Sequence, residues 1–91
     1  MDADAVLGHA PRVFLRRTSE SLVLLGTGAM PEVLRGTGIA IWDAFASPAR
    51  VSEVTSALAV AYGADPLEVA RESAPLIDAL LASGLLTPVD S

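Results

Sequence analysis

A chain of 91 residues is long enough for one small domain with a single core. Its hydrophobic content of 52% excludes an intrinsically disordered chain, and the absence of cysteine excludes a disulfide framework and a thiolate metal site. The net charge of −5 disfavours generic binding to nucleic acid, because the phosphate backbone is negative as well.

The first ten residues, MDADAVLGHA, carry acidic residues where a secretory signal peptide carries basic ones. No apolar run approaches the roughly 20 residues that a membrane-spanning helix needs. We therefore expect a cytoplasmic protein with a flexible N-terminus over residues 1–10, one domain over residues 11–88 and a flexible C-terminus over residues 89–91. His9, the sole histidine, is expected to lie in solvent without a fixed partner.

Three short apolar segments then predict β-strands. The first covers residues 13–15, ahead of two arginines, and the second covers residues 22–25, with a polar hairpin turn between them. The glycine-rich stretch at residues 26–28 ends the second strand. Residues 31–35 form the third, with Pro31 at its start or at a sheet edge because proline has no N–H to donate.

The apolar spacing becomes helical after the second Gly-Thr-Gly, at residues 36–38. Ile39, Trp42 and Phe45 predict a short helix entered at Thr37 and stopped near Pro48. Trp42 is expected in the core. Apolar positions at i, i+3, i+4, i+7 and i+8 predict a second helix over residues 54–62, which Gly63 is placed to end.

The third helix has the clearest start of any element. Asp65 suits the N-cap, Pro66 the first helical position, and Glu68 the place three residues after the cap. This helix should run to about Ser83 and be followed by a short apolar tail at residues 85–87. The fold class is therefore α+β, with a three-stranded antiparallel sheet followed by three helices.

The third helix carries two apolar stripes. The first comprises Leu67, Ala70, Ala74, Ile77 and Leu81, and the second comprises Val69, Ser73, Leu76 and Leu80. One stripe is enough to dock a helix on a small core, so the second is either buried too or forms the floor of a groove. Pro75 lies inside the helix and predicts a kink rather than two separate helices, since the apolar period continues past it.

No arrangement of residues indicates catalysis, so we expect no enzyme activity, no cofactor and no metal. The two Gly-Thr-Gly segments lack the lysine of a phosphate-binding loop, because the chain contains no lysine at all. The acids at the start of the third helix are ordinary for that position. A small DNA-binding regulator remains an alternative because three helices and a small sheet form a winged helix, but the third helix carries three acids, Glu68, Glu72 and Asp78, against one Arg71.

Residues 22–86 resemble the PqqD-like family, also called the RiPP recognition element. The shared pieces keep order and spacing: LVLL at 22–25, LRGTGIAIW at 34–42, a second helix ending in Tyr62-Gly63, Asp65-Pro66-x-x-Val69, and the leucine-rich segment 76–86. One departure is Arg35, which stands where the family pattern has asparagine and which puts the usual helix cap in doubt.

The resemblance implies a winged-helix-like fold and a non-catalytic peptide chaperone. Such a domain binds the leader segment of a ribosomally synthesised precursor peptide on the free edge of its third strand and presents it to a modifying enzyme, a radical SAM enzyme or a leader protease. The implied peptide-binding residues are Glu32, Val33, Leu34 and Arg35 on the strand and Val69, Arg71, Glu72, Ser73, Leu76 and Leu80 on the third helix. A scaffold subunit that binds no leader is a second alternative, and the edge strand would also permit a homodimer.

Overall fold

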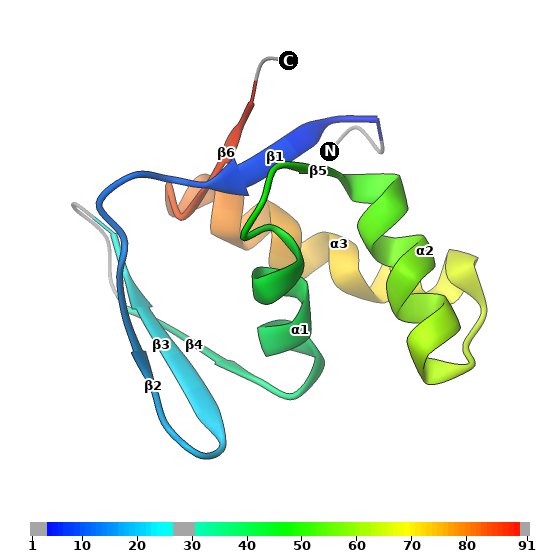
Figure 1. The fold of residues 1–91 in the computed structure, drawn as a ribbon, viewed down its shortest axis with the longest axis horizontal. Helices are drawn as coiled ribbons and strands as arrows, with labels where there is room; N and C mark the ends of the chain where they lie inside the picture. Colours follow the sequence, from blue (N-terminus) through cyan, green and yellow to red (C-terminus); the bar gives the residue numbers. More distant parts are fainter. Residues whose placement is uncertain (1–3, 27–30, 90–91) are drawn as a thin grey trace.

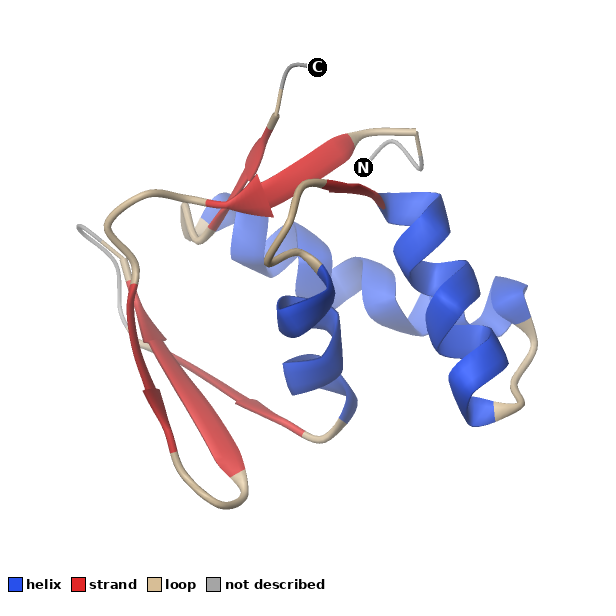
Figure 2. Ribbon diagram, in the orientation of Figure 1, coloured by secondary structure: helices blue, strands red, loops and turns tan. Residues whose placement is uncertain are grey.

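The structure is a computed structural model that describes residues 4–26 and 31–89. In this part of the chain, three helices and two three-stranded antiparallel sheets make a mixed α+β fold (Figures 1 and 2). The elements in chain order are β1 (Val6–His9), β2 (Phe14–Arg17), β3 (Ser21–Leu25), β4 (Glu32–Arg35), α1 (Thr37–Ala44), β5 (Ala49–Arg50), α2 (Val51–Tyr62), α3 (Pro66–Ala82) and β6 (Leu86–Pro88).

The three strands predicted from the sequence form one sheet in the order β2-β3-β4. Leu22 pairs with Leu34 and Leu24 with Glu32, so the inward positions of β3 and β4 share one face. Leu22, Leu24 and Leu34 are all buried there, because side chains alternate between the two faces of a strand. The helices cover only this face of the sheet (Figure 1).

The ends of the two longer helices follow the predicted signals. Gly63 ends α2 in a left-handed conformation at φ 63°, which glycine adopts without steric cost. The Asp65 carboxylate caps α3 by accepting a hydrogen bond of 2.9 Å from the backbone N–H of Leu67. The helix of α3 is continuous through Pro75, as the sequence indicated.

The expectation of a flexible N-terminus over residues 1–10 is wrong for residues 6–9. These residues form β1, the central strand of the second sheet, between β5 and β6. The supposed apolar tail at residues 85–87 contributes to β6. None of these strands is long enough to be recognised alone, and each is stabilised by pairing with segments far away in the sequence.

His9 is also not the solvated residue that we expected. Its ring stacks on the indole of Trp42 with 3.7 Å between ring centroids and 8° between planes. Its Nε2 lies 2.7 Å from the backbone carbonyl oxygen of Trp42, so the nitrogen donates a hydrogen bond there. These contacts attach the end of β1 to the C-terminal half of α1.

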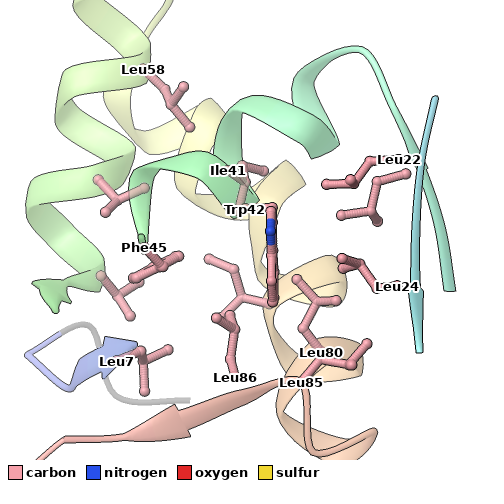
Figure 3. Close-up of a cluster of buried hydrophobic side chains, with 14 residues drawn as sticks. Leu7, Leu22, Leu24, Ile41, Trp42, Phe45, Leu58, Leu80, Leu85 and Leu86 are labelled. Carbon is pink, nitrogen blue, oxygen red and sulfur yellow. The ribbon is translucent and has the colours of Figure 1, made fainter. Parts of the chain in front are cut away.

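Trp42 lies at the centre of the core, among side chains from both sheets and all three helices (Figure 3). Leu22 and Leu24 approach it from the first sheet, and Leu85 and Leu86 from the chain end. The expectation that Trp42 is a core residue is confirmed, since only 1% of it is exposed. Within the described residues, no helix has the length and apolarity needed to cross a bilayer.

The burial of β1 predicts a large effect of Leu7→Ala. Leu7 is 1% exposed, and its truncation should lower the free energy of unfolding by about 2–5 kcal/mol through lost apolar contacts and the cavity left behind. Leu67→Ala is the matched control, because Leu67 is 75% exposed and should change stability by less than about 0.5 kcal/mol. Urea unfolding followed by Trp42 fluorescence measures both, and equal midpoints would contradict the placement of β1 in the core.

Candidate functional site

Strand β4 is an edge strand, and its register determines which backbone groups face outward. The Thr18 N–H donates to the Ser21 carbonyl oxygen at 2.9 Å, so Ser21 faces β2. Backbone groups alternate along a central strand, so Leu22 and Leu24 face β4, where they pair with Leu34 and Glu32. The N–H and C=O groups of the two remaining residues of β4, Val33 and Arg35, therefore point away from the sheet.

The inward side of β4 is fixed against α3. Leu34 is buried, and the Ser83 hydroxyl donates a hydrogen bond of 3.3 Å to the Glu32 carboxylate. This bond joins the start of β4 to the C-terminal end of α3. Glu32 therefore has a structural partner, while the outward backbone groups of β4 remain accessible.

A cavity of about 350 Å³ opens beside the C-terminal end of β4. It lies between the first turns of α1, the connection from α2 to α3, and one face of α3. Most of its lining is apolar, and Glu72 contributes the only charged side chain. The lining residues are Thr37, Gly38, Ile41, Tyr62, Ala64, Val69, Glu72, Ser73 and Leu76.

Gly38 lies where β4, α1 and α3 meet. A Cβ atom built on Gly38 would lie 3.4 Å from Leu76 Cδ2 and 3.6 Å from Leu34 Cβ. A side-chain Cβ at Gly38 would thus be in ordinary van der Waals contact, and the first turn of α1 packs closely against both the strand and the third helix. This close approach places the end of the free edge next to the cavity.

The residues of the second apolar stripe of α3 lie in two different places, the cavity and the core. Val69, Ser73 and Leu76 line the cavity together with Glu72, which supports the groove interpretation for this part. Leu80 is 0% exposed in the core and is not among the residues that line the cavity, so the structure does not place it beside the other predicted binding residues. Arg71 is exposed but is not among the residues that line the cavity.

Five lining residues were missed in the predicted site: Thr37, Gly38, Ile41, Tyr62 and Ala64. The signal for most of them was present in the family-like motifs. Thr37, Gly38 and Ile41 belong to the T-G-x-x-I-W segment, and Tyr62 belongs to the Tyr-Gly pair at the end of the second helix. These motifs are distant in sequence, so only the fold shows that they converge with Val69 on one cavity.

The chemistry available at this site is that of recognition. Ser73 is buried on the cavity wall, and Glu72 can accept hydrogen bonds or attract a cation. Among residues 4–26 and 31–89, no three histidine, aspartate or glutamate side chains lie close enough together to hold a metal ion. A mainly apolar cavity with a few polar side-chain groups, next to outward-facing backbone donors and acceptors, suits an extended peptide.

Comparison with known proteins identifies a family for this chain. The family model described as Coenzyme PQQ synthesis protein D (PqqD) matches residues 22–86, which include all but the first residue of β3, the whole of β4 and all three helices. The match therefore spans the whole candidate site, whereas β1 and β2 lie outside it. No curated protein and no solved structure matches the chain.

The two glycines that flank Thr37 should respond oppositely to alanine. Gly36 has φ 55°, where a side chain is strained, so Gly36→Ala should destabilise the domain by about 1–3 kcal/mol. Gly38 is helical, and its added methyl group would make only van der Waals contacts, so Gly38→Ala should stabilise the domain by about 0.5–1 kcal/mol. Urea unfolding measures both, and a shift in the same direction would contradict this account of the β4–α1 corner.

Proposed function

The chain belongs to the PqqD family of non-catalytic accessory proteins in PQQ biosynthesis, and we propose that it binds the leader segment of a ribosomally synthesised precursor peptide and presents it to a modifying enzyme. Proteins of this family interact with a precursor peptide and with a modifying enzyme. The observation that carries the proposal for this chain is the free edge of β4 beside an apolar cavity.

Binding by strand addition requires backbone groups without partners on an edge strand. Val33 and Arg35 supply two N–H donors and two carbonyl acceptors that face away from β3. A leader segment aligned with β4 would pair with these groups and become a fourth strand of the sheet. The recognition of backbone groups gives affinity without demanding one particular peptide sequence.

The cavity supplies the contact that selects side chains. It begins two residues after β4 ends, so a peptide paired antiparallel to β4 directs residues on its N-terminal side there. An apolar anchor would be covered by Val69, Ile41 and Leu76, and Glu72 favours a basic or neutral neighbour over an acidic one. A micromolar complex needs a binding free energy of about −8 kcal/mol. A few backbone hydrogen bonds to β4 and one or two buried apolar side chains of the peptide can supply it.

The alternative of a DNA-binding regulator has no support at the corresponding surface. A recognition helix presents basic side chains to the phosphates, but the exposed side chains of α3 include Glu68, Glu72 and Asp78 and the single Arg71. The alternative of a scaffold subunit differs from the proposal in one measurable property, the affinity for the leader.

Val33→Pro tests the backbone ladder. The substitution removes an N–H that faces outward and leaves the pairing of Glu32 and Leu34 with β3 intact, so the domain should stay folded. Binding of a fluorescent leader peptide, taken from the precursor encoded nearest to this chain, should weaken by about tenfold or more in anisotropy titrations. Val33→Ala keeps the N–H and should bind within about threefold of the unaltered chain; equal affinities of the two variants would contradict strand addition.

Leu76→Asp tests the cavity. Leu76 is half-buried on the cavity wall, and a carboxylate there should weaken leader binding by about 1–3 kcal/mol while the domain remains folded. Leu67→Asp introduces the same charge on the same helix at a position that is 75% exposed, and it should leave the affinity unchanged. Equal losses in the two variants would indicate a general charge effect, and unfolding of Leu76→Asp would assign Leu76 to the core.

A further inference from the structure

Within the described residues, no helix covers the second face of the sheet β2-β3-β4 (Figure 1). Its side chains occupy the positions that alternate with the buried leucines, and we call this surface the outer face. The strand pairing places these side chains next to one another across the three strands. Phe14 pairs with Leu25 and Arg16 with Val23 between β2 and β3, and Val23 pairs with Val33 between β3 and β4. The outer face comprises Phe14, Arg16, Ser21, Val23, Leu25, Val33 and Arg35.

The apolar content of the outer face is unusual for a surface in solvent. Phe14 is 72% exposed, Val33 is 52% exposed and Leu25 is 41% exposed. A sheet with one solvated face normally alternates apolar and polar residues, but β3 reads SLVLL and is apolar on both sides. Contiguous exposed apolar side chains of this kind mark an interaction surface.

The charge of the outer face is opposite to that of the whole protein. Arg16 and Arg35 lie on it, and neither forms an ion pair within the described part of the chain. The only acid within the three strands, Glu32, is turned inward to Ser83, and Glu20 lies in the hairpin turn. The chain as a whole has 11 acidic and 6 basic residues, so the outer face is a cationic surface on an acidic protein.

This charge argues against a second copy of the chain as the occupant. In a symmetric dimer the same patch meets itself, which would bring the arginines of one copy against those of the other. Like charges at an interface disfavour association, whereas a patch of opposite charge promotes it. The chemistry of the outer face therefore requires an apolar surface bordered by carboxylates.

We propose that the outer face is a docking surface for the modifying enzyme, which contacts it through an apolar patch bordered by carboxylates. The identity of the partner rests on the proposed function, because an accessory protein that presents a leader must contact an enzyme. The outer face is separate from the cavity, which lies on the helical side of the sheet, and β3 separates β2 from the edge strand. The outer face shares only Val33 and Arg35 with the proposed leader site, so an enzyme docked on the β2 side leaves the edge of β4 and the cavity open to the leader.

The test uses the modifying enzyme encoded beside this chain, titrated into the full-length domain by calorimetry. Arg16→Glu and Phe14→Ser should each weaken enzyme binding by about tenfold or more, because both side chains lie on β2 and both are exposed. The controls on α3 are Arg71→Glu, which makes the same change of charge, and Leu67→Ser, which likewise replaces an exposed apolar side chain by serine; each should alter enzyme binding by less than about twofold. Leader affinity, measured by anisotropy without the enzyme, should be retained by both β2 variants.

Three results would overturn this assignment. Losses in the controls equal to those in the β2 variants would show that the enzyme does not contact the outer face. A dimer of the chain alone in analytical ultracentrifugation that Phe14→Ser converts to a monomer would assign the face to a second copy. An equal loss of leader affinity in the β2 variants would show that the two surfaces are not separate. Failure of the proposed function would be recognised separately, by the absence of leader binding to the unaltered chain.

Discussion

The antiparallel pairing of β3 with β4 is the constraint on which the other features depend. Because Leu22 and Leu24 pair with Leu34 and Glu32, three leucines point into the core together. The same register turns the N–H groups of β4 that are not used by β3 toward solvent. A shift of one residue would bury Val33 in place of Leu34 and direct the free backbone groups into the sheet, so stability and the binding edge require the same pairing.

The corner between β4 and α1 then decides where the cavity lies. Gly36 adopts φ 55°, which turns the chain sharply from the strand into the helix, and Gly38 in the first turn of that helix lies against both Leu34 and Leu76. No side-chain cap stabilises the start of α1, so its position depends on packing. The repeated Gly-Thr-Gly that suggests a phosphate loop in the sequence has a geometric role at this second occurrence; the first occurrence, residues 26–28, extends beyond the described residues.

Elements with strong local signals could be predicted from the sequence, and those that depend on distant pairing could not. Asp65 and Pro66 specify the start of α3 locally, and the apolar strands of the first sheet are adjacent in the chain. By contrast, β1 is a strand only because β5 and β6 pair with it, and His9 is held by its pairing with Leu86 and by its stacking on Trp42. For the site, the apolar periodicity identified one face of α3 but not which of its residues line the cavity. Leu76 lines the cavity and Leu80, one helical turn further along the same face, is buried in the core.

The proposed leader site and the outer face meet at β4, and this contact explains how the domain could present a bound leader to an enzyme. A strand added to the edge continues the pleat, so its side chains alternate between the helical side and the outer face. One set is directed toward the cavity side, and the other set extends the surface formed by Val33 and Arg35. A partner docked on the outer face would therefore contact the chain and the bound peptide together, and it would bind the loaded domain more tightly than the empty one. By thermodynamic linkage, the leader would gain the same factor in affinity from the docked partner.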